Sequence, residues 1–149
     1  MLYFTYICNP MALVYITRKE HFNAAHKLWN EKWSDEKNLE MFGKCANPNW
    51  HGHNYIIYVT VKGVPDADTG YFINLKELST LIRTKITDRM DHRNLNLDVE
   101  FLKGQQTSCE NVAVAIWLQL VDEIKKLGGT LHSIKLYETE NNYVEYFGE

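Results

Sequence analysis

The feature that most constrains the fold is the regular alternation of side chains in residues 51–62. Successive side chains of a strand point to opposite faces of a sheet, so a strand here would gather its apolar side chains on one face. That face would carry, in order, His51, His53, Tyr55, Ile57, Val59 and Val61. Such an apolar stripe needs a second layer to bury it. The stretch therefore predicts a strand packed on one side, with two histidines where the apolar stripe begins.

Other segments of the chain also have the pattern of regular structure. In chain order they are a strand at residues 13–25, a helix from Asn74 to about Met90, a helix that starts with a Thr107–Glu110 capping box and stops at Gly128-Gly129, and a hairpin of residues 131–138 and 143–147. Residues 27–50 are polar and irregular, which predicts a long excursion. The order ββααββ predicts an α+β fold, in which an antiparallel four-stranded sheet carries two helices on one face. The open edges of so small a sheet favour oligomerisation.

The length of 149 residues fits a single domain. Met11 comes directly before the first strand pattern, so we expect a domain of residues 11–149 and an N-terminal extension of residues 1–10. The extension is apolar, but Asn9-Pro10 interrupts it well short of a membrane span and no basic residue precedes it. We therefore expect no membrane anchor.

Charge and cysteine content narrow the classes of function. The net charge is −3 and contains no basic run, so we expect no nucleic-acid partner. The three cysteines, Cys8, Cys45 and Cys109, form an odd set without a CxxC pair. Such a set favours free thiols in a reducing compartment, so the expected location is cytoplasmic.

Three histidines could form a metal site. His51 and His53 lie two apart on the predicted strand, so their imidazoles leave the same face with Cα atoms about 7 Å apart. His26, at the end of the preceding strand pattern, can supply a third nitrogen if the two strands pair antiparallel. Three neutral imidazoles with an open fourth position are typical of catalytic zinc. The alternative is that they are ordinary polar residues at strand ends.

Two further groups could carry proton chemistry. Cys45 lies in the irregular excursion six positions before His51, so its thiol can fold back over the histidine face as a ligand, a base or inert filler. Asp91 directly precedes His92, and a carboxylate beside an imidazole can orient it for proton transfer. The alternative is that the dipeptide ends the preceding helix, where a cationic His92 would interact favourably with the helix dipole.

Two carboxylates differ in how well local structure explains them. The expected capping box accounts for Glu110. Glu138 shares a strand face with Ile134 and Leu136, where an unpaired carboxylate would be costly to bury. A ligand with a pair of donors, such as a guanidine-like edge, would satisfy Glu138, and at the strand end solvent would also do so.

Five ordered segments together resemble the 6-pyruvoyl-tetrahydropterin synthase family. They are FNAAH (22–26), CANPNWHGHNY (45–55), MDHRNLN (90–96), ENVAVAIW (110–117) and YETENN (137–142). The resemblance covers nearly everything after Met11. It implies the tunnelling fold, in which three subunits join their sheets into a barrel and two trimers stack into a hexamer with active sites between subunits.

The resemblance implies a role for each candidate residue. By matching position, the metal ligands are His26, His51 and His53, the catalytic residues are Cys45, Asp91 and His92, and the pterin-binding residues are Glu110 and Glu138. Cys45 would be the base, and Asp91 with His92 would assist proton transfer from a neighbouring subunit. The implied cofactors are Zn²⁺ and, with the substrate triphosphate, Mg²⁺.

The implied activity is that of a lyase in tetrahydrobiopterin biosynthesis. It converts 7,8-dihydroneopterin triphosphate to 6-pyruvoyl-tetrahydropterin and releases triphosphate. One alternative is the similar 6-carboxy-tetrahydropterin synthase of the queuosine pathway, and another is a non-catalytic zinc or pterin-binding module. The five-residue interval between Cys45 and His51 favours the pyruvoyl branch, because the carboxy enzymes usually have a shorter one. The presence of Cys45, Asp91 and His92 argues against the non-catalytic module.

Two positions depart from the family pattern. Trp50 stands where the family often has Gly, but strand alternation puts it on the face opposite His51 and His53, so we expect the metal site to be unaffected. Ser108-Cys109 stands where many relatives carry Thr, which changes the hydrogen bonds expected at the pterin edge.

Overall fold

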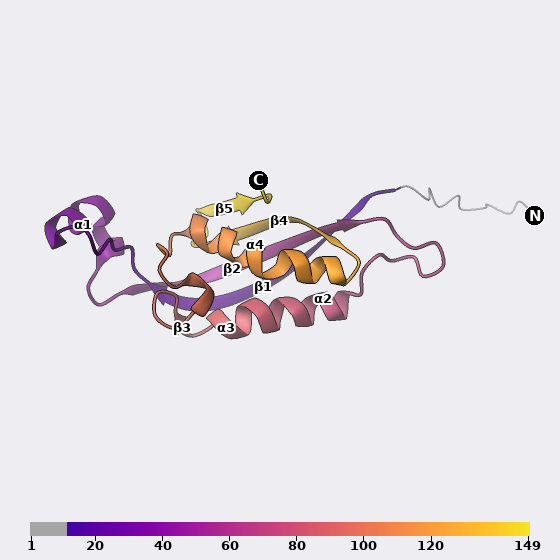
Figure 1. The fold of residues 1–149 in the computed structure, drawn as a ribbon, viewed down its shortest axis with the longest axis horizontal. Coiled ribbons are helices and arrows are strands. Elements are labelled where there is room, and N and C mark those ends of the chain that lie inside the picture. Colours follow the sequence, from indigo (N-terminus) through magenta and orange to yellow (C-terminus); the bar gives the residue numbers. More distant parts are fainter. Residues whose placement is uncertain (1–11) are drawn as a thin grey trace, which may run out of the picture.

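The computed structural model describes residues 12–149, so the expected extension at residues 1–10, with Cys8, lies outside the described residues. A five-stranded sheet in the order β3-β1-β2-β4-β5 forms one layer, and the long helices α2 and α4 form the other (Figure 1). The strands are β1 (Val14–His26), β2 (His51–Gly63), β3 (Arg93–Asn94), β4 (Thr130–Tyr137) and β5 (Tyr143–Tyr146). The α-helices are α1 (Asp35–Phe42), α2 (Leu75–Ile82), α3 (Asp88–Met90) and α4 (Cys109–Lys126). None of the helices in this range is long and apolar enough to cross a lipid bilayer.

The α+β class is confirmed, but the prediction of an all-antiparallel sheet of four strands is wrong. β1, β2, β4 and β5 pair antiparallel as expected. The additional strand, β3, runs parallel to β1, with Arg93 beside Ala24 and Asn94 beside Ala25. Two residues are too few for side-chain alternation to be visible in a sequence, so only the tertiary pairing defines this strand.

The prediction of two helices is also incomplete, because the excursion of residues 27–50 contains α1. Ser34 caps this helix by accepting a hydrogen bond from the Lys37 amide. The side chain facing inward is Asn38, which is fully buried and exchanges hydrogen bonds with the main chain of Asn30. A helix held by a buried amide lacks an apolar stripe, which is why its pattern gave no signal. α1 stands at one end of the molecule, away from α2 and α4 (Figure 1).

The two predicted helices form close to their predicted bounds. Asn74 caps α2, and its side chain also donates to Glu77, as expected. α2 continues through a π-helical turn at Arg83–Thr87 into α3, which ends at Met90. The cap of α4 is Ser108 rather than Thr107, because the Ser108 hydroxyl accepts from the helix amide at the third position after it.

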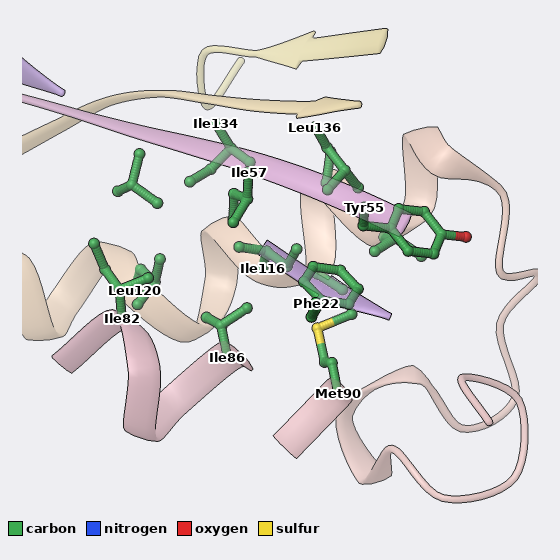
Figure 2. Close-up of a cluster of buried hydrophobic side chains, with 14 of the residues drawn as sticks. Phe22, Tyr55, Ile57, Ile82, Ile86, Met90, Ile116, Leu120, Ile134 and Leu136 are labelled. Carbon is green, nitrogen blue, oxygen red and sulfur yellow. The ribbon is translucent and has the colours of Figure 1, made fainter. Parts of the chain in front are cut away.

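The core lies between one face of the sheet and the helices α2 and α4, as Figure 2 shows. The apolar stripe of β2 is buried over its length. Its side chains pack against Ile82 of α2, Ile86 of the π-helical turn that follows α2, and Ile116 and Leu120 of α4 (Figure 2). Both long helices therefore cover the same face of the sheet, as predicted. The histidines of β2 lie beyond the end of this apolar stripe.

Candidate metal centre and active site

His26, His51 and His53 converge at one end of the β1–β2 ladder. The register places His26 directly opposite His51 and Ala24 opposite His53. The ring centroid of His26 lies 4.5 Å from that of His51 and 5.1 Å from that of His53. The centroids of His51 and His53 are 5.0 Å apart. One nitrogen of each ring can be chosen so that all three lie within 4.8 Å of one another. The three rings could therefore hold one metal ion.

Gly52, which lies between His51 and His53 and was not among the predicted site residues, allows this approach. A Cβ at Gly52 would lie 2.9 Å from the Ala24 carbonyl oxygen, which is fixed in the neighbouring strand. Any side chain here would force β1 and β2 apart between the metal-ligand candidates. The glycine between the two histidines of β2 was the available signal.

The electrostatics favour neutral imidazoles. The His26 side chain is only 2% exposed, and its Nδ1 donates to the Thr107 carbonyl oxygen at 2.8 Å. Burial, reinforced by the neighbouring His51 and His53, lowers the pKa of His26 to about 4 even though the Thr107 carbonyl acts in the opposite direction. Burial and His53 also lower the pKa of His51. At neutral pH these rings therefore carry free lone pairs.

Buried nitrogens without partners fit a metal better than a structural role. Nε2 of His26 and both ring nitrogens of His51 have no hydrogen-bond partner among the described residues. Buried polar atoms normally have partners, so three such atoms in one cluster indicate a ligand. Nitrogen donors with one ring oriented by a main-chain carbonyl suit zinc.

A cavity of about 340 Å³ opens beside His26 and is lined in part by Cys45, Cys109, Glu110 and Glu138. Cys45 lies in a 3₁₀ turn, and its carbonyl accepts a hydrogen bond from the Leu28 amide. This hydrogen bond holds the turn that contains Cys45 close to the C-terminal end of β1. The structure thus brings together two thiols, two carboxylates and a metal-ligand candidate around a space suited to a small molecule.

The capping role expected for Glu110 is not observed. The cap is Ser108, and the Thr107 hydroxyl shares its proton between Asn96 Oδ1 at 3.0 Å and the Lys27 carbonyl at 3.3 Å. Glu110 lies in the first turn of α4 and lines the cavity, with no side-chain hydrogen bond among the described residues. Its carboxylate is therefore available to a ligand.

Glu138 follows β4 directly, and its side chain is 25% exposed. One carboxylate oxygen lies 3.4 Å from Nε2 of His26 and 3.6 Å from Nε2 of His53. Glu138 lines both the cavity with Cys45 and a hollow of about 660 Å³ that reaches His53 and Tyr55. It therefore stands between the histidines and the space for a small molecule.

Asp91 and His92 lie at the edge of the sheet. His92 Nδ1 is 2.8 Å from the Asp91 carboxylate, whose other oxygen accepts from the Asn23 amide of β1. The Asn23 amide, helped by His92, lowers the pKa of Asp91. The His92 side chain is 78% exposed, and neither residue is among those that line the cavity with Cys45. The pair therefore lies outside the cavity of Cys45, whereas His92 shares a separate hollow of about 470 Å³ with His53.

The two departures from the family pattern occupy defined places. Trp50, directly before β2, has a φ of 68°, in the left-handed region where glycine is unstrained, which explains why a glycine suits this position. The ammonium of Lys27 lies 4.7 Å from the centre of its ring. Cys109 lines the cavity and donates to the Leu136 carbonyl, and burial raises its pKa to about 12. Cys109 is therefore a neutral thiol in the cavity wall.

The fold and the site together define an α+β domain in which three histidines that could hold a metal ion lie beside a cavity of small-molecule size. Comparisons with known proteins agree with this class. The family model for 6-pyruvoyl tetrahydropterin synthase matches residues 15–149. The 6-pyruvoyl tetrahydrobiopterin synthase of Dictyostelium discoideum is 43% identical over 136 residues, which cover 91% of this chain and 97% of that protein. The chain belongs to the 6-pyruvoyl tetrahydropterin synthase family.

A solved structure supports the same assignment. The 6-pyruvoyl tetrahydropterin synthase of Caenorhabditis elegans superposes with a TM-score of 0.84 at 37% identity, covering 94% of this chain and 99% of that one. The 6-carboxy-5,6,7,8-tetrahydropterin synthase of Rickettsia typhi is more distant, at 23% identity over 149 residues, which cover 89% of this chain and 99% of that protein. The pyruvoyl branch is therefore the more similar of the two.

Proposed function

We propose that this enzyme is a zinc-dependent lyase that converts 7,8-dihydroneopterin triphosphate to 6-pyruvoyl-tetrahydropterin and releases triphosphate. The observation that carries the proposal is the convergence of three imidazoles, two of them with buried nitrogens that lack partners among the described residues, in a chain of this family. Three nitrogen donors leave a position open for substrate, as in catalytic zinc sites. The greater similarity to the pyruvoyl enzymes favours this product over the carboxy one.

The proposed roles follow from position. His26, His51 and His53 hold the metal, which when bound supplies a Lewis acid beside the cavity. Cys45, on the cavity wall, removes a proton from the substrate side chain.

Two carboxylates on the same wall bind the pterin. Glu138 accepts from its amino and ring N–H groups, since an ionised carboxylate can accept both. Glu110 makes a second contact to the pterin. Mg²⁺ would accompany the triphosphate.

We further propose that the active site is completed between subunits of a hexamer. The Asp91–His92 pair is exposed and lies at the sheet edge beside β1, where a neighbouring chain can bring it to another cavity. His92 has a φ of 56°, and strained backbone of this kind often marks functional residues. Residues 11–149 would form the catalytic domain, working in the cytoplasm.

The test is an incubation of the zinc-loaded protein with 7,8-dihydroneopterin triphosphate under anaerobic conditions. We expect triphosphate release and a tetrahydropterin that keeps all three side-chain carbons, identified by mass spectrometry. A carboxy product with stoichiometric acetaldehyde would move the chain to the queuosine branch. Failure to release triphosphate would support the non-catalytic binding module instead.

A further inference from the structure

The hydroxyl group of Tyr55 is a buried polar group that the roles above do not use. Tyr55 is fully buried in β2, two residues after His53, and its ring stacks on Phe22 with centroids 4.9 Å apart. Its hydroxyl oxygen has no hydrogen-bond partner among the described residues. A phenylalanine would fill the apolar space equally well, and a buried hydroxyl without a partner is costly. We therefore expect the Tyr55 hydroxyl to have a hydrogen-bond acceptor when the site is occupied.

The Tyr55 hydroxyl is directed away from the aliphatic core (Figure 2). Figure 2 shows the Tyr55 ring at the edge of the aliphatic cluster, with its oxygen directed away from Ile82 and Ile86. The ring centroid lies 6.1 Å from that of His26 and 5.6 Å from that of His53. The Tyr55 ring thus lies next to the rings of His26 and His53.

Glu138 contacts the same two histidines. Its carboxylate lies 3.4 Å and 3.6 Å from their Nε2 atoms, and it lines one hollow together with Tyr55 and His53. Nδ1 of His26 carries the proton donated to the Thr107 carbonyl, so Nε2 of the neutral ring offers the carboxylate no proton. Once these rings hold a metal, the carboxylate needs donors from elsewhere.

Two donors of the surrounding wall differ in whether they already have an acceptor. The Cys109 thiol is directed at the Leu136 carbonyl. The Tyr55 hydroxyl has no acceptor among residues 12–149. We propose that Tyr55 is a positioning residue: with metal and pterin bound, its hydroxyl donates a hydrogen bond to the Glu138 carboxylate and holds it towards the amino and ring N–H groups of the pterin. This inference rests on the proposed function and adds a residue to its pterin site.

A double-mutant cycle tests the proposal, with the zinc-loaded wild type, Tyr55→Phe, Glu138→Gln and the double variant. Affinity for 7,8-dihydroneopterin, which lacks the triphosphate, is measured by titration calorimetry alongside zinc content. We expect Tyr55→Phe to keep its zinc and to weaken pterin binding about 10-fold, since a hydrogen bond to a charged group is lost. The double variant should bind no more weakly than Glu138→Gln. The control is Tyr58→Phe, because Tyr58 faces the other side of β2, and its affinity should not change.

Stability separates positioning from a structural role. Metal-free Tyr55→Phe should unfold in urea at the wild-type midpoint or above it, because its hydroxyl has no protein partner there. A clearly lower midpoint would assign the hydroxyl to the fold and overturn the proposal. Wild-type pterin affinity in Tyr55→Phe, or losses that add in the double variant, would also overturn it while leaving the proposed function intact. If the wild-type zinc protein binds no pterin, the proposed function itself fails.

Discussion

His26 should make the stability of the metal-free protein depend on pH. Its pKa is 6.5 in an ordinary setting and about 4 in the folded protein, where burial disfavours the charged ring. Between these values the unfolded chain binds a proton that the folded protein does not. The free energy of unfolding must therefore fall as the pH falls through this range and be fully retained above it.

The difference between the two pKa values of His26 corresponds to about 3 kcal/mol. The same linkage gives a loss of about 2 kcal/mol by about pH 5, relative to pH 8. His51, whose pKa is also lowered by burial, adds to the total in the same direction. A control variant is therefore needed to isolate the contribution of His26.

His26→Asn supplies that control, because the amide nitrogen of Asn can replace Nδ1 as the donor to the Thr107 carbonyl without titrating. Urea unfolding of both chelator-treated proteins, at one fixed protein concentration, is followed from pH 8 to pH 4.5. The wild type should lose about 2 kcal/mol more than His26→Asn by about pH 5. Parallel pH profiles of the two proteins would refute the reasoning, since His26 would then titrate equally in both states.

Three further predictions concern the site. His51→Ala and His53→Ala should each lose the single zinc per chain, measured by elemental analysis, whereas His132→Ala, in β4 away from the cluster, should keep it; zinc retained in both site variants would refute the ligand set. Cys45→Ala should keep zinc and lose about 10²- to 10⁴-fold in turnover, the range for removal of a general base; a parallel loss of zinc would make Cys45 a ligand. Gly52→Ala should lower the free energy of unfolding by about 1–3 kcal/mol and weaken zinc binding, because the new Cβ meets the Ala24 carbonyl oxygen at 2.9 Å; wild-type values for both would show that the strands can separate without cost.

Much of the fold could be predicted because its main elements are long and regular. The alternation in β2 and the capped, amphipathic segments of α2 and α4 left few alternatives. The sequence failed where an element depends on a single tertiary interaction. α1 is held by the buried amide of Asn38, and β3 exists only because two residues meet β1. The cap of α4 is Ser108, and Thr107 instead hydrogen-bonds to Asn96 and His26, two residues that are distant in the sequence.

The sequence alone determined which side chains share a face. A period of two places His51 and His53 together at the end of an apolar stripe, whatever the strand pairs with, because strand geometry is local. Only the tertiary structure decided the register that sets His26 opposite His51, the Thr107 carbonyl that orients the His26 ring, and the burial that keeps that ring neutral. Pairing register and desolvation depend on residues far apart in the chain, and local periodicity carries no information about either.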